Sequence, residues 1–325
     1  MNSSATASDK SEDTETLSAL ISPIQAKALK AGLAINEDPE TEPLTLAPWF
    51  MASLSLPYRD PGSGLLAWER ENGNVRIILS PYVDRGKAYY PYGVIPRLLL
   101  TWMTTEAIRT RSPEIKIAES LSAFMRQVGV GKGGTQKQRL LDQMQRLFNA
   151  NIRLEHQELV EREGTELVHQ TTRNFQFAEE HELWLKKENG VATSIEWGST
   201  VTLSPRFYES IKEHSFPIYT EALRALGNSP LRLDIYLFMV NRIFRLKGRT
   251  RITWEQLNAQ FGGNYKHLRM FKHAFIKHLD AVSVVYPEAR FAVSNKFLML
   301  YPSGQHVPSM PENIQSLGES PDFAR

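Results

Sequence analysis

The sequence predicts an α+β protein in which one small unit occurs twice. Three observations lead to this fold class. Residues 115 to 163 have the order strand, helix, glycine-rich turn, helix and hairpin. The same order of patterns returns between residues 231 and 293. In both places the second helix carries several cationic side chains on the face that its apolar stripe leaves open.

The first helix of the first unit has an apolar residue at every position that one buried face requires. These residues follow the i, i+3, i+4, i+7 spacing and are Leu121, Phe124, Met125 and Val128. The helix is expected to end at Gly129, because the glycines of the segment 129–134 can adopt the positive φ of a sharp turn.

The second helix is predicted to start at Thr135, which has the spacing of a capping box with Gln138. Its buried stripe consists of Leu140, Leu141, Met144, Leu147 and Phe148. The polar residues of the turn and helix are then expected on the open sides, where they could contact DNA: Lys132, Thr135, Gln136, Lys137, Arg139, Gln143 and Arg146.

A hairpin follows this helix. Ile152 and Leu154 alternate with charged residues, and Thr165–Val168 supplies a return strand after a charged turn. Strand, helix, helix and hairpin in this order describe a winged-helix domain. Such a domain usually lays its second helix in a DNA major groove while the hairpin, or wing, touches the backbone or minor groove.

The second unit repeats these patterns after the apolar segment 231–240, which predicts a buried helix. Thr253 and Gln256 form another capping box, and Asn264 is expected to cap the second helix after Gly262 and Gly263. The wing is predicted from residues 284–286 and 291–293. The cationic residues that this second helix displays are Lys266, Arg269, Lys272, His273 and Lys277.

Composition divides the chain into four segments. Residues 1–48 are expected to form an acidic, largely disordered tail and linker, and residues 308–325 a disordered tail. Between them we expect a first winged-helix domain over 49–206, with an extra N-terminal hairpin, and a second over 207–307. Residues 1–60 carry four basic and nine acidic side chains, so the rest of the chain has a net charge of +7 within a total of +2. A basic body suits a polyanionic partner.

The chain lacks the residues that several classes of protein need for their function. The chain has no cysteine, so disulfides and thiolate chemistry are excluded, and a reducing cytoplasm is expected as its location. The run Gly131–Thr135 departs from a phosphate-binding loop, because a glycine and not Ser or Thr follows the lysine. His181–Glu182 lacks the second histidine of a zinc motif. We therefore predict no enzyme activity, no metal, no cofactor and no membrane span.

The segment Tyr90–Trp102, together with Thr105–Ala107 and Ser120–Gly129, resembles the plasmid-encoded RepA replication initiator family. The resemblance implies two winged-helix domains that bind double-stranded origin repeats, help to open an AT-rich region, and recruit the host replicative helicase and initiator. It also implies a monomer–dimer equilibrium and a role in plasmid copy control.

Two further interpretations stay open at this stage. The main functional alternative is a winged-helix transcriptional regulator, including an autorepressor. A further class is a structural or partition-associated DNA protein, which should show little sequence preference. Separately, Ser53–Leu56 resembles part of the peptide by which related initiators contact the sliding clamp, so Leu54 and Leu56 are candidate clamp residues. An ordinary strand is the alternative interpretation of that segment.

Overall fold

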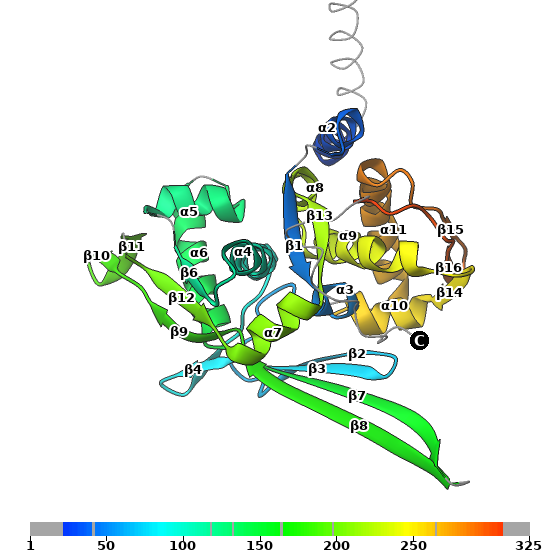
Figure 1. The fold of residues 1–325 in the computed structure, drawn as a ribbon, viewed down its shortest axis with the longest axis horizontal. Coiled ribbons are helices and arrows are strands. Elements are labelled where there is room, and N and C mark those ends of the chain that lie inside the picture. The colour runs from blue at the N-terminus through cyan, green and yellow to red at the C-terminus, as the bar shows by residue number, and fades with distance from the viewer. Residues whose placement is uncertain are drawn as a thin grey trace, which may run out of the picture.

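The computed structural model describes residues 22–40, 43–117, 119–131, 133–162, 165–196, 198–263 and 265–307. It is a mixed α+β protein, as predicted, with several small antiparallel sheets among helices (Figure 1). The expected tail segments 1–21 and 308–325 lie outside the described residues.

The first unit is built on a long buried helix and a three-stranded sheet. Its elements in chain order are α4 (Val94–Thr110), β6 (Glu114–Lys116), α5 (Leu121–Val128), α6 (Gly134–Phe148), β9 (Ala178–Glu182) and β12 (Thr200–Leu203). The sheet has the order β6-β12-β9. A short hairpin, β10 (Leu185–Glu188) and β11 (Val191–Ile195), lies between β9 and β12 in the chain and forms its own two-stranded sheet.

The second unit has the same succession of elements. They are α9 (Pro230–Arg242), β14 (Thr250–Thr253), α10 (Trp254–Phe261), α11 (Leu268–Val285), β15 (Phe291–Val293) and β16 (Phe297–Leu300), with a short 3-10 helix, Ile243–Arg245, after α9. Its sheet has the order β14-β16-β15. In both units the first strand therefore pairs with the third, and the third with the second.

A long hairpin interrupts the first unit. Its strands β7 (Asn151–Arg162) and β8 (Thr165–Gln176) project from the body at the bottom of Figure 1. They form a separate sheet of order β2-β3-β7-β8 with β2 (Trp68–Asn72) and β3 (Val75–Ser80). Beside this sheet lies a small pair of strands, β4 (Tyr82–Asp84) and β5 (Lys87–Tyr89).

The hairpin predicted between residues 152 and 168 is present, but its pairing differs from the prediction. Ile152 and Leu154 pair with Leu79 and Ile77 of β3, because these apolar side chains complete one buried face. The strands that share a sheet with β6 are β9 and β12. The second wing is shifted in a similar way: residues 284 and 285 continue α11, and β15 and β16 form the hairpin.

Residues 22–40 and 43–48, which the composition assigned to a largely disordered tail and linker, contain regular elements in the structure. Helix α2 (Pro23–Glu37) packs on α11 so closely that a Cβ at Gly32 would lie 2.5 Å from the Val284 carbonyl oxygen. Strand β1 (Leu44–Pro48) pairs with β13 (Ser215–Tyr219), and α3 (Phe50–Ser53) follows it. Long-range pairing orders a segment whose composition resembles a linker.

One continuous core runs through both units, and α7 (Pro205–Glu213), β13 and α8 (Thr220–Leu226) connect them. The predicted boundary at residue 207 falls within α7, and the division into two domains there stays a prediction. The hairpin around Gly73 is confirmed as β2–β3, with φ +58° at the glycine.

Three local predictions can be compared with the helix ends. Helix α5 ends at Val128 with Gly129 in the left-handed region at φ +80°, as predicted. The capping box of Thr253 and Gln256 is also confirmed. The Thr135 capping box is wrong: α6 begins one residue earlier and Gln138 bonds elsewhere. The glycines at 133 and 134 let the helix start before the threonine.

Candidate nucleic-acid interface

Helix α6 presents only part of its predicted polar set to solvent. Thr135 and Arg139 are exposed, and Gln136 and Lys137 are half-buried. Lys132 lies outside the described residues, so its contact with DNA stays a prediction. The exposed members of the predicted polar set therefore lie near the N-terminal end of this helix.

Gln143 and Arg146 do not lie on an open side of α6, contrary to the prediction. Gln143 is buried and accepts a 2.8 Å hydrogen bond from the Tyr92 amide. Arg146 is 12% exposed and pairs at 2.9 Å with both Asp60 and Asp142. The reason is the chain before α4, which lies over the C-terminal half of α6 and which the helical periodicity cannot reveal. Both residues hold the fold together.

The β10–β11 hairpin lies beside the N-terminal half of α6. The Gln138 side-chain amide donates a 2.8 Å hydrogen bond to the Ala192 carbonyl of β11. The strand β10 carries the exposed cations Lys186 and Lys187. By contrast, the segment 151–176 of the projecting hairpin carries three arginines and five glutamates. The short hairpin is therefore better suited than the long one to a polyanion.

Helix α11 displays a more continuous cationic surface. Lys266 precedes it, and Arg269, His273 and Lys277 are exposed along it, in agreement with the predicted face. Lys272 is half-buried: its ammonium donates a 3.0 Å hydrogen bond to the Asn295 carbonyl and lies 5.2 Å from the Trp254 ring centroid. The predicted cap Asn264 lies outside the described residues.

The two units place one corresponding contact at the same position. Gln138 is the fifth residue of α6, and Lys272 is the fifth residue of α11. Each side chain donates to a backbone carbonyl of the hairpin in its own unit, at Ala192 and Asn295 respectively. In both units, one hydrogen bond thus fixes the hairpin beside the helix. No spacing in the sequence predicts this contact, because the hairpin of the first unit is far from α6 in the chain.

A hollow of about 570 Å³ separates α6 from the second unit. Three cationic side chains from three elements line it, Lys27 of α2, Arg139 of α6 and Arg224 of α8. No aspartate or glutamate is among the lining residues that the structure describes. Arg224 forms a 2.6 Å ion pair with Glu221 on its own helix. The net effect is a basic recess beside the exposed part of α6.

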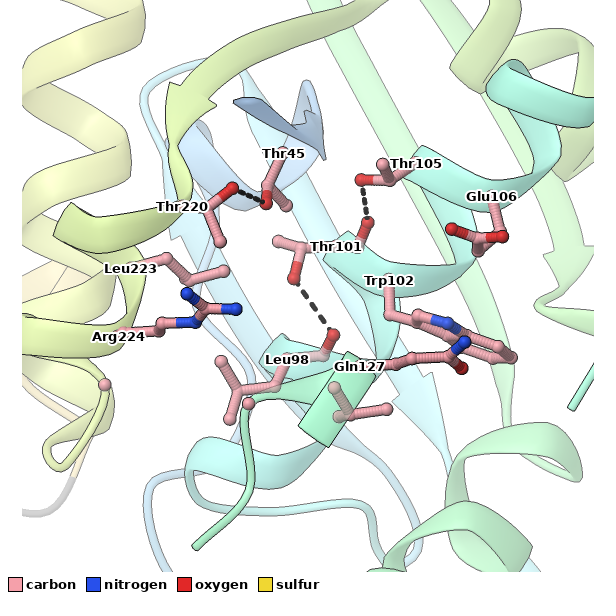
Figure 2. Close-up of a pocket in the computed structure, with 13 residues that line it drawn as sticks. Thr45, Leu98, Thr101, Trp102, Thr105, Glu106, Gln127, Thr220, Leu223 and Arg224 are labelled. Atoms are coloured by element: carbon pink, nitrogen blue, oxygen red, sulfur yellow. Dashed lines mark hydrogen bonds between the residues drawn. The ribbon is translucent and has the colours of Figure 1, made fainter. Parts of the chain in front are cut away.

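A smaller neighbouring cavity of about 160 Å³ lies between α4, α5, β1 and α8, and Figure 2 shows it. Its hydroxyl groups are used within the protein: Thr45 and Thr220 bond each other at 2.8 Å, and Thr101 and Thr105 donate to carbonyl groups of α4. The Thr105 oxygen also accepts from the Leu46 amide. These threonines join α4 to β1 and β1 to α8, and they leave little polar chemistry for a ligand.

The candidate clamp residues Leu54 and Leu56 are 3% and 4% exposed. Their neighbour Ser55 donates a 2.8 Å hydrogen bond to the Gln260 carbonyl of α10. The segment therefore lies in the core between the units, and a clamp could reach it only if it left that core. The clamp contact stays a prediction, and in this conformation the two leucines are not accessible to a clamp.

The described part of the chain contains neither a metal-binding cluster nor a membrane-spanning helix. No group of three or more His, Asp or Glu side chains there could hold a metal ion. None of the helices over the described ranges is long and apolar enough to cross a membrane.

Residues 90–256 match the protein family described as plasmid encoded RepA protein. The chain belongs to this family. Its members are plasmid replication initiators, so the predicted resemblance is confirmed. The RepA match begins at Tyr90 and runs through α4, the α5–α6 pair and α9 into α10.

Two crystal structures resemble the fold at low sequence identity. They contain domains 2 and 3 of RctB, one as a SeMet derivative, with 11% and 10% identity and a TM-score of 0.47 for each. Each match covers 78% of this chain, and 96% and 95% of the RctB chains. No curated protein sequence matches the chain.

The RepA signature Tyr90–Gly93 has a structural explanation. Tyr90 donates a 2.7 Å hydrogen bond to the Leu65 carbonyl, and its own carbonyl accepts from Arg146 at 3.2 Å. Gly93 adopts a φ of +78°, its amide donates to the Pro57 carbonyl at 2.9 Å, and the residue caps α4. The signature therefore ties α4, α6 and the preceding segment together, and its residues need not touch DNA.

Proposed function

We propose that this RepA family member is a sequence-specific, origin-binding initiator that reads double-stranded DNA with two winged-helix units. One observation supports this most strongly. The helix, strand, helix, helix, strand, strand order occurs twice, with the hairpins β7–β8 and β10–β11 inserted in the first unit, and the strand order is the same in both three-stranded sheets. This is the architecture that inserts its second helix in a major groove.

The first reading surface in this proposal consists of the N-terminal half of α6 and the β10–β11 hairpin. Arg139 reaches a base edge, Thr135, Gln136 and Lys137 flank it, and Lys186 and Lys187 neutralise phosphates. Lys27 and Arg224 line the recess next to Arg139 and supply further phosphate contacts. Compared with the sequence prediction, this contact set leaves out Gln143 and Arg146 and adds Lys27, Lys186, Lys187 and Arg224, and the predicted contact of Lys132 lies outside the described residues.

The second reading surface consists of α11 and the β15–β16 hairpin. Arg269 and His273 lie one turn apart on the exposed side, and Lys266 and Lys277 extend the cationic surface at either end. Lys272 supports the hairpin through its bond to Asn295 and contributes positive charge beside it. Two such surfaces on one chain suit adjacent or repeated DNA sites.

The test is a binding titration with duplex DNA from the region that flanks the gene. Arg139→Ala and Arg269→Ala should each weaken binding to the preferred sequence by about 1–3 kcal/mol, because each removes a base contact. Arg206→Ala is the matched control, since this arginine is equally exposed but lies on α7. If either α6 or α11 variant binds like the Arg206 control, that helix does not read DNA.

The same titration separates initiation from regulation. An initiator should prefer repeated sites beside an AT-rich region, whereas a transcriptional regulator should prefer one inverted operator at its own promoter. Recruitment of the host helicase, host initiator and sliding clamp belongs to this proposal and requires binding measurements with each purified host protein. A monomer–dimer equilibrium should be measured by sedimentation in the presence and absence of the DNA.

A further inference from the structure

The base helices of the two units are joined by a buried ion pair. Arg97 of α4 donates from Nε and Nη2 to the two carboxylate oxygens of Asp234 on α9, at 2.7 and 2.8 Å. The side chains are only 1% and 2% exposed. A bidentate pair of this kind permits few relative orientations, because two parallel hydrogen bonds fix both distance and plane.

The chain segment 52–58 also restricts the relative orientation of α4 and α9. Arg97 also donates to the Leu56 carbonyl at 2.8 Å and to the Gly93 carbonyl at 2.6 Å, and its guanidinium lies 5.2 Å from the Tyr58 ring centroid. Gln260 of α10 donates to the Ala52 carbonyl at 3.1 Å. The segment 52–58 therefore contacts both units at once, with the Arg97 side chain at its centre.

The position of the pair matters for the two helices proposed to read DNA. Helix α4 packs against α6, and α9 packs against α11. An angular change between α4 and α9 would therefore be carried directly to α6 and α11. Each unit contributes one charge of the pair. A relative movement that separated Arg97 from Asp234 would therefore leave both charges buried and unpaired.

We infer that Arg97 and Asp234 are specificity-determining positioning residues, which set the spacing and rotation between the two DNA half-sites that the chain accepts. This inference rests on the proposed function, since it concerns DNA bound by both units. Its ligand is duplex DNA with two half-sites at one fixed helical phase. Neither side chain touches the DNA.

The first test needs no DNA and so is independent of the proposed function. The natural chain has no cysteine, so Gln145→Cys on α6 and Asp280→Cys on α11 supply two exposed positions for spin labels. The distance distribution between them should be narrow in the otherwise unchanged chain. It should broaden in Arg97→Met/Asp234→Leu, which replaces the pair with apolar groups and keeps the site filled.

The second test measures spacing on DNA. The probe is the best duplex recovered from a random library by the unchanged chain, with five base pairs, about half a helical turn, inserted between its two footprinted halves. The insertion should strongly weaken binding by the unchanged chain. In the double variant this penalty should be at least about threefold smaller, because loosely coupled units can follow the displaced half-site.

Controls separate the possible outcomes. Thr104→Val changes a buried residue of α4 that is not part of the pair, and it should leave both measurements unchanged. If the double variant fails to fold, Arg97→Lys is used in its place, since it keeps the positive charge opposite Asp234 and loses the bidentate geometry. An unchanged label distribution together with an unchanged insertion penalty would overturn the inference. If the unchanged chain bound no duplex at all, the proposed function would fail, and a broadened distribution would still establish the coupling.

Discussion

The Gln138 side-chain amide donates a 2.8 Å hydrogen bond to the Ala192 backbone carbonyl, which joins the helix α6 to the hairpin β10–β11. These residues are 54 positions apart in the chain. The contact determines which hairpin can act together with the helix at a DNA surface. It favours the short hairpin over the long hairpin β7–β8, which pairs with β3 and projects away from α6.

Replacing Gln138 with Ala should loosen β10–β11 without unfolding the first unit. The lost hydrogen bond is exposed, so its contribution to stability is about 0.5–1.5 kcal/mol. Amide hydrogen exchange should speed up across residues 185–195 and stay the same in β9 and β12. Gln145→Ala, on an exposed position of the same helix, is the control. Equal exchange in both variants would show that the hairpin is held by other contacts.

Arg146→Ala should reduce the stability of the fold and leave DNA binding of the folded fraction unchanged. The substitution leaves Asp60, Asp142 and the Tyr90 carbonyl without their shared donor, and we expect a loss of about 1–3 kcal/mol. Denaturant unfolding measures it, with Arg139→Ala as an exposed arginine that should change stability by less than about 0.5 kcal/mol. A lowered salt slope of DNA binding for Arg146→Ala would instead assign this arginine to a phosphate.

His306 is enclosed by three tyrosine rings near the end of the described chain. The ring centroids of Tyr286, Tyr219 and Tyr236 lie 4.3, 4.9 and 5.7 Å from that of the imidazole. Burial lowers the pKa of His306 to about 3. Burial, and then the charges of Arg232 and Lys277, lower the pKa of His278 to about 4. Both histidines are therefore neutral in the folded protein at neutral pH.

The sign of the pH dependence follows from these lowered values. Below about pH 6.5 the unfolded chain binds protons on His306 and His278 that the folded chain does not bind, so stability falls as the pH decreases toward the folded-state pKa values. For His306 alone the loss between pH 7.5 and pH 5 should be about 2 kcal/mol. His306→Phe keeps an aromatic ring and should remove that part of the loss in denaturant unfolding at the two pH values. An identical pH dependence in both proteins would mean that folding does not lower the pKa of His306.

Leu54→Ala and Leu56→Ala should each destabilise the protein by about 2–5 kcal/mol, because both side chains are buried between the units. Loss of clamp retention by these variants would therefore not identify a docking peptide unless the folded fraction is measured. Circular dichroism during thermal unfolding provides that measurement. Wild-type stability in both variants, combined with lost retention on a purified clamp, would contradict the structural role and support the clamp contact.

The α+β class and the two helix pairs could be predicted because they depend on local periodicity. The stripe from Leu121 to Val128, the stop at Gly129 and the capping box at Thr253 are each encoded within a few residues. The exposed cations of α11, such as Arg269, could be predicted for the same reason. One helical period is sufficient to separate the buried face from the open face.

The features of the structure that could not be predicted from the sequence depend on pairing between distant segments. The open side of α6 at Gln143 is covered by the chain near Tyr92, and β1 is ordered by a strand that comes more than 160 residues later. The hairpin that accompanies α6 could not be chosen by sequence, because two hairpins follow the helix, one turning near Gly164 and the other near Gly190. Register and partner choice are properties of the whole fold.

Hydroxyl-radical footprinting of the preferred duplex tests the central claim most directly, since it shows how many DNA segments the chain contacts. The unchanged chain should protect two segments. Arg139→Ala should lose protection over one segment and Arg269→Ala over the other, because each arginine belongs to a different unit. Protection of a single segment, or loss of the same segment in both variants, would contradict the account of two DNA-reading units.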